Sequence, residues 1–123
     1  MQSENDTNRL HRIIEAIREK KGQDPVVLDL SGISPLCDYF VIASAPSVRQ
    51  VKAIAEEVKE SMEKGFVPLM HQEGFREGRW ILLDYGDLVI HLFVTEDREY
   101  YQLETIWKDA PTLDIDTCSS VNV

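Results

Sequence analysis

A β-hairpin signal within residues 75–93 limits the folds that this chain can adopt. Two apolar runs, at 80–83 and 88–93, are joined by Asp84-Tyr85-Gly86-Asp87, which is typical of a tight turn between antiparallel strands. Both runs are apolar at successive positions, so large apolar side chains fall on both faces of the hairpin. A chain of 123 residues has limited means of covering two such faces, which leaves one of them available to a partner.

The hairpin side chains separate into two faces, because successive residues of a strand point to opposite sides of a sheet. The loop is either Tyr85-Gly86 or Gly86-Asp87, and both choices give the same faces. The aliphatic face is predicted to be core and carries Ile81, Leu83, Leu88, Ile90 and Leu92. The mixed face carries Trp80, Leu82, Asp84, Val89, His91 and Phe93. The mixed face is either a binding surface or core beneath a helix, with His91 hydrogen-bonded inside it.

Helices and strands alternate along the remaining chain. Polar side chains at 5–8 are suited to cap a first helix that ends near 20–22, and Ser47 is the expected N-cap of a second helix that ends near 64–65. A third helix is predicted to begin near Thr95 and to run to Trp107. Strands are predicted at 26–30, at 39–43 and, at a sheet edge because of Pro68, at 66–70. This order predicts an α/β (α+β) fold, a mixed β-sheet packed with helices.

Length and pattern predict one domain over residues 1–108, followed by a mobile acidic tail. A chain of 123 residues is long enough to bury a core without metals or disulfides. Residues 109–123 show no periodicity and include Pro111. The sequence therefore predicts a single domain followed by a short tail at residues 109–123.

Charge favours a basic protein partner over nucleic acid. The chain holds 13 basic and 22 acidic residues, a formal net charge of −9. It has no basic cluster that would displace counterions from a phosphate backbone. No apolar run is long enough to span a bilayer, and the first residues lack the pattern of a secretory signal. Two distant cysteines, Cys37 and Cys118, fit reduced thiols and a cytoplasmic location.

No catalytic, cofactor or metal site is predicted. The turn at 43–47 precedes a helix but lacks the glycine and lysine pattern of a phosphate loop. The three histidines, His11, His71 and His91, lie on separate elements without metal-ligand spacing. Asp84 and Asp87 form the one carboxylate pair that could hold a divalent cation for nucleotidyl or phosphoryl transfer, although aspartates are common in turns. Cys37, which precedes Asp38, could be a nucleophile, but nothing in the sequence argues for a lowered pKa of its thiol, so a semi-buried thiol is favoured.

Five stretches carry a resemblance to a known family. They are Cys-Asp-Tyr-Phe-Val-Ile-Ala-Ser (37–44), Arg-Gln-Val-Lys-Ala-Ile-Ala (49–55), the segment from Glu73 to Asp87, Val-Ile-His-Leu-Phe (89–93) and Arg-Glu-Tyr-Tyr-Gln-Leu-Glu-Thr-Ile-Trp (98–107). With these motifs, in order from about residue 9 to residue 110, the chain resembles the ribosomal silencing factor family, which is related to Iojap.

The resemblance implies a function by binding. Members of the family bind a basic protein of the large ribosomal subunit, ribosomal protein fourteen, block joining of the small subunit when nutrients run short, and form dimers when free. It also implies a topology similar to nucleotidyltransferases, whose catalytic Gly-Ser turn and Asp-x-Asp pair are missing here, since this chain has Ala43-Ser44-Ala45 and turn aspartates separated by two residues. A transferase remains the alternative function.

The predicted partner-binding residues come from the hairpin and the last helix. Aromatic anchors supply most of the affinity of a typical interface, and acids at its rim meet basic groups on the partner. Tyr101 is included because it points away from the apolar stripe of the last helix. The full set is Trp80, Leu82, Asp84, Tyr85, Asp87, His91 and Tyr101.

Overall fold

The structure is a computed structural model that describes residues 4–101 and 110–116. The chain runs α1 (Glu4–Glu19), β1 (Gln23–Asp29), β2 (Tyr39–Ala45), α2 (Val48–Lys64), β3 (His71–Glu73), β4 (Trp80–Asp84), β5 (Leu88–Val94), α3 (Thr95–Tyr101) and β6 (Thr112–Leu113). The strands form one sheet in the order β3-β4-β5-β2-β1-β6. Among the strands that the structure describes, β2 and β5 are the one parallel pair, which makes the sheet mixed, as the sequence predicts.

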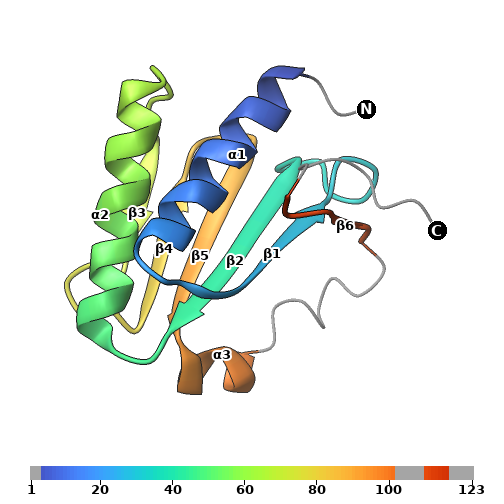
Figure 1. Cartoon of the computed structure of the whole chain (residues 1–123). Coiled ribbons are helices and arrows are strands. Elements are labelled where there is room, and N and C mark those ends of the chain that lie inside the picture. Colours follow the sequence, from blue (N-terminus) through green and yellow to red (C-terminus); the bar gives the residue numbers. More distant parts are fainter. Residues whose placement is uncertain (1–3, 102–109, 117–123) are drawn as a thin grey trace.

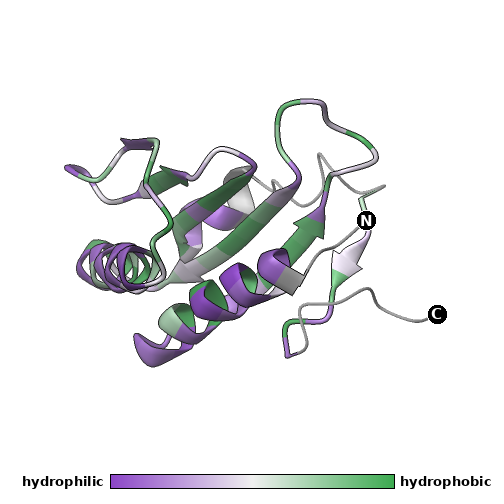
Figure 2. Ribbon diagram, turned by 90° about the horizontal axis from the view of Figure 1, so that it is seen from above, coloured by the Kyte–Doolittle hydropathy of each residue, from purple (hydrophilic) through white to green (hydrophobic). Residues whose placement is uncertain are grey.

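Helices α1 and α2 lie side by side on one face of the sheet, while α3 lies at one end of it (Figure 1). Seen from above, their polar sides face outward and their apolar sides face the strands (Figure 2). The periodicity of α2 explains this, because its buried residues recur at helical spacing: Val51, Ile54, Ala55, Val58 and Met62. The two helices therefore supply the layer that covers the aliphatic face.

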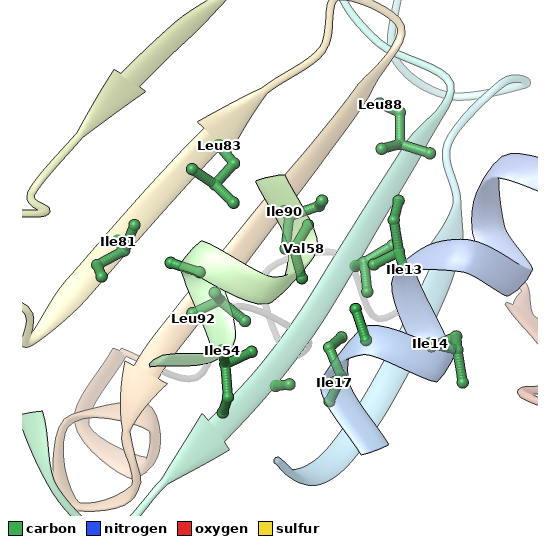
Figure 3. Close-up of a cluster of buried hydrophobic side chains, with 14 of the residues drawn as sticks. Ile13, Ile14, Ile17, Ile54, Val58, Ile81, Leu83, Leu88, Ile90 and Leu92 are labelled. Carbon is green, nitrogen blue, oxygen red and sulfur yellow. The ribbon is translucent and has the colours of Figure 1, made fainter. Parts of the chain in front are cut away.

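The aliphatic face of the hairpin is core, as predicted. Ile81, Leu83, Leu88, Ile90 and Leu92 are fully buried against both helices (Figure 3). Asp84 pairs with Val89, and the amide of Tyr85 donates to the carbonyl of Leu88 at 2.9 Å. This register makes Gly86-Asp87 the loop, and Gly86 takes a φ of +94°, which glycine adopts without steric cost. The face assignment is thereby confirmed and one of the two open loop choices is selected.

The start of α2 also matches its prediction. The hydroxyl of Ser47 accepts a hydrogen bond from the amide of Gln50 at 3.2 Å, the usual N-cap contact. At its other end the helix stops at Lys64, as predicted; Gly65 keeps a φ of −87°, and Phe66 takes the left-handed conformation at +60°. The amide of Val67 donates to the carbonyl of Met62 at 2.9 Å and closes the last turn.

Three segments differ from the sequence predictions. Helix α1 already includes residues 5–8, so these polar residues do not cap it. The strand predicted at 66–70 is wrong: this segment is irregular, and the edge strand β3 follows it at His71–Glu73, beyond Pro68. Within the predicted tail, Thr112–Leu113 form β6 on β1, with Leu113 3% exposed. A two-residue strand has no periodicity for a sequence to display.

Candidate partner-binding face

The mixed face of the hairpin is built around His91, which sits between aromatic rings on three strands. The register places Trp80 of β4 directly opposite Phe93 of β5, and their ring centroids are 5.0 Å apart. The ring of Phe40 on β2 meets the imidazole edge to face at 4.7 Å. Such contacts contribute beyond the area they bury and fix the orientation of each ring. The cluster is therefore a rigid platform across β4, β5 and β2.

One hydrogen bond sets the chemical state of this histidine. The indole Nε1 of Trp80 donates to Nδ1 of His91 at 3.1 Å, so Nδ1 is an acceptor and the proton of the neutral ring is assigned to Nε2. His91 is 5% exposed, and its Nε2 has no hydrogen-bond partner in the part of the chain that the structure describes. Burial lowers the pKa of His91 to about 4, which keeps the ring neutral near pH 7.

The mixed face divides into a buried half and a partly exposed half. Over β1, β2 and β5 it forms a second, smaller core of Leu28, Leu30, Ile42 and Phe93. Over β4 the side chains of Trp80 and Leu82 remain partly exposed, as does Val89 at the start of β5. The interpretation as core is correct for the buried half, where His91 is hydrogen-bonded, although neither α1 nor α2 lies over this face. Figure 1 shows both of these helices on the opposite side of the sheet.

The carboxylates of the hairpin turn are engaged within the chain. Oδ1 of Asp84 accepts from the amide of Gly86 at 2.8 Å and closes the turn. Arg9 of α1 makes two hydrogen bonds to Asp87, at 2.9 and 2.8 Å. These bonds to the guanidinium lower the pKa of the Asp87 carboxyl. Arg9 also pairs with Asp6, whose other oxygen accepts from the hydroxyl of Tyr39 at 3.2 Å.

The structure brings together only part of the predicted site. Trp80, Leu82, Asp84 and His91 share one face of β4 and β5. Tyr85 lies apart from them, on the opposite face with Ile81 and Leu83, where it is 6% exposed and belongs to the main core. Tyr101 is the last residue of α3, which follows the end of β5 remote from the turn, and its side chain lies outside the described residues.

Sequence reasoning missed two contributions near the site. Arg9 lies 78 residues from Asp87, and nothing in the sequence signals that α1 reaches the hairpin turn. Phe40 and Ile42 of β2 extend the mixed face beyond the hairpin. They are two residues apart, so they lie on the same side of that strand. This side of β2 joins the mixed face only because β2 pairs in parallel with β5. The hydrophobic pattern of a strand does not show which other strand it pairs with.

Among residues 4–101 and 110–116 no three histidine, cysteine, aspartate or glutamate side chains are grouped to hold a metal ion. Over the same ranges no helix has the length and apolarity needed to cross a bilayer.

The fold defines the class: an α/β domain whose mixed sheet carries two helices on one face and an aromatic platform on the other. Residues 3–122 match the family model described as ribosomal silencing factor during starvation. The ribosomal silencing factor RsfS of Bacillus subtilis is 44% identical over 101 residues, which cover 82% of this chain and 86% of that relative. The RsfS of Halalkalibacterium halodurans is 38% identical over 107 residues, which cover 87% and 92%.

A solved structure agrees with these sequence matches. A crystal structure of a Chromobacterium violaceum protein superposes with a TM-score of 0.79 at 34% identity, covering 87% of this chain and 88% of the other. The chain belongs to the ribosomal silencing factor family, which confirms the resemblance found in its motifs. The two Bacillus and Halalkalibacterium relatives carry the name of a silencing factor rather than of an enzyme.

Proposed function

We propose that this protein is a cytoplasmic translational repressor. It binds the large ribosomal subunit through the basic ribosomal protein fourteen and blocks association with the small subunit, without catalysing a reaction. Membership of the silencing factor family over residues 3–122 is the observation that carries this proposal. The net charge of −9 supports a basic protein partner and disfavours extensive contact with ribosomal RNA. When free, the protein forms a homodimer.

The proposed contact surface is the exposed half of the mixed face. Trp80 and Leu82 are its anchors, because they are large, partly exposed and fixed by the rigid sheet beneath them. His91 holds the indole of Trp80 in place rather than meeting the partner itself, since it is almost fully buried. Asp84 and Asp87 form an acidic rim at the turn, and the side chain of Asp87 remains 41% exposed beside Arg9.

Sedimentation through a sucrose gradient tests the proposal. The protein is expected to migrate with free large subunits and to be absent from assembled ribosomes, because a factor that blocks joining occupies a site that the small subunit covers. Equal binding to assembled ribosomes would remove the blocking mechanism.

Binding kinetics separate the anchors from the rim. Trp80→Ala is expected to cost about 2 kcal/mol or more in affinity for ribosomal protein fourteen, mainly by faster dissociation. Asp87→Asn is expected to cost less and to slow association in a salt-dependent way. If Trp80→Ala keeps full affinity, the contact surface lies elsewhere on the protein.

A further inference from the structure

Positive charge gathers at one end of this acidic protein. The cations come from the residues that follow α1, from the first two turns of α2 and from the loop between β3 and β4. Figure 1 shows these three places at the same end of the sheet, opposite the turn between β4 and β5. The surface is called the basic end, and its cations are Lys20, Lys21, Arg49, Lys52 and Arg76.

Hydrogen bonds hold the three elements together at the basic end. The side-chain amide of Gln50 donates to the carbonyls of Lys20 and Lys21, at 3.1 Å each, and so joins the end of α1 to the start of α2. Nζ of Lys52 donates to the carbonyl of Arg76 at 2.8 Å and joins α2 to the loop. The cations therefore belong to one surface. They form no cluster in the sequence, because they come from three separate segments.

The cations of the basic end have no acidic partner. Exposed cations elsewhere, such as Arg18, Lys64 and Arg79, each form an ion pair with a carboxylate. Within the described residues no carboxylate forms an ion pair with a cation of the basic end. Lys52 is partly exposed and the others are exposed. Their charge is therefore available to an anion from outside the chain.

The charges of α2 run against its dipole. The amino end of a helix is positive and favours acids, but the first turn of α2 contains none. Arg49 and Lys52 lie there instead, three residues apart, so that two like charges share one side of the helix. The acids lie in its C-terminal half: Glu56, Glu57, Glu60 and Glu63. This order lowers the stability of the helix, and departures of this kind from a stable arrangement are typical of functional surfaces.

We propose that the basic end contacts backbone phosphates of RNA on the large ribosomal subunit. Lysine and arginine side chains bind phosphate oxygens with strong, charge-assisted hydrogen bonds. Because the cations extend over three elements, they match a row of phosphates better than a single small anion. The choice of ribosomal RNA rests on the proposed function. The preference for RNA phosphates does not depend on it.

A contact of this size is compatible with an acidic protein. The net charge of −9 opposes a broad interface with RNA, whereas the basic end engages only a few phosphates. The opposite end of the sheet carries Asp84 and Asp87 at the hairpin turn (Figure 1). A protein with separated charges is oriented as it approaches a surface where a basic protein lies beside RNA. The two ends would then contact different components of the subunit.

The first test measures affinity for purified bacterial large ribosomal subunits at several salt concentrations. The double variant Arg49→Gln with Arg76→Gln removes one cation from α2 and one from the loop. It is expected to bind about tenfold more weakly, because two phosphate contacts are lost. The slope of log affinity against log salt concentration is expected to become shallower by about 1.5 for the same reason.

The matched control is Arg12→Gln with Lys64→Gln. It makes the same change in net charge at two exposed positions, both beside the C-terminal end of α2. Its affinity is expected to change by less than about threefold, with a nearly unchanged salt slope. Thermal unfolding of each variant verifies that the fold is intact. Equal effects of the two double variants, or no effect of the basic-end variant, would overturn the proposal.

The second test does not require the ribosome and separates the basic end from the proposed function. Amide shifts of the full chain are followed at low salt during titration with a short RNA duplex and, separately, with an oligoglutamate peptide of the same charge. The duplex is expected to shift residues 20–22, 47–52 and 75–78. The peptide is expected to shift them much less, because a flexible chain loses more conformational entropy on binding than a duplex does.

The outcomes of this titration are distinct. Equal shifts with both ligands would identify an acidic protein rather than RNA as the partner, and the absence of duplex-induced shifts at the basic end would exclude the phosphate contact. Either result overturns the proposal. If the unmodified protein fails to bind large subunits but the duplex alone shifts the basic end, the proposed function fails and the preference for RNA phosphates stands.

Discussion

His91 shows how one residue links packing to pH. Its imidazole is surrounded by Trp80, Phe40 and Phe93, and none of these carries a charge that would stabilise a protonated ring. Burial lowers its pKa from 6.5 to about 4. The unfolded chain therefore binds more protons than the folded chain between these two values. Stability from this group is fully present above pH 6.5 and is lost as the pH falls toward 4.

Replacement of His91 by asparagine should remove this dependence. The amide keeps an acceptor for the indole of Trp80 but does not titrate. Between pH 7 and pH 4 the free energy of unfolding of the unmodified protein should fall by up to about 3 kcal/mol more than that of His91→Asn. Urea unfolding at several pH values measures the difference, and His71→Asn, at an exposed position, is the control. Parallel pH profiles for His91→Asn and the unmodified protein would contradict the assignment.

Phe66 is a second residue whose conformation carries a cost. Its side chain is almost fully in solvent, so removing the ring loses little burial, whereas glycine relieves the left-handed strain. Phe66→Gly should raise the free energy of unfolding by about 0.5 to 1 kcal/mol. Phe66→Ala loses the same ring and keeps the strain, so it should not raise stability. Thermal or urea unfolding measures the stability of both variants. If Phe66→Gly is less stable than the unmodified protein, the Phe66 ring contributes packing that outweighs the backbone strain.

At the scale of elements, the Arg9–Asp87 pair ties the first turns of α1 to the hairpin turn. Because the Asp87 side chain is partly exposed, Asp87→Asn should lower the free energy of unfolding by only about 1 kcal/mol at neutral pH. Arg9 depresses the pKa of Asp87 below 3.8, so the stabilisation is present above that pH and is lost as the pH falls below it. The difference in free energy of unfolding between Asp87→Asn and the unmodified protein should therefore become smaller at acidic pH. Asp24→Asn, at an exposed position, is the control. If both variants lose the same free energy of unfolding, the Arg9–Asp87 pair does not stabilise the fold.

Elements with strong local signals could be predicted from the sequence. Alternation in 80–93 predicts both faces of the hairpin, and Ser47 predicts the start of α2. The segment 66–70 misleads because its apolar residues suggest a strand, whereas the chain there is irregular around Pro68. The candidate site was only partly predictable: Tyr85 follows directly after β4, and a turn residue can point to either face. The contact of Arg9 with Asp87 joins residues 78 apart, and no local sequence pattern predicts such a contact.

On the scale of the whole molecule, the two ends of the sheet carry opposite charge. The turn at 84–87 holds Asp84 and Asp87, and the basic end lies at the other end of the strands. The mixed face, with Trp80 and Leu82, extends between them. The Arg9 bond and the closed turn make the turn region rigid, which limits the conformational entropy lost on binding. A rigid acidic domain of this kind fits the proposed role of a protein that acts by binding.

The most direct test of this account is the rate and extent of ribosomal subunit joining, followed by light scattering. Large subunits are incubated with the protein before small subunits are added. The scattering amplitude is expected to fall as the protein concentration rises, and the Trp80→Ala variant is expected to require a higher concentration for the same effect. Unchanged joining at a protein concentration that saturates the large subunits would contradict the account.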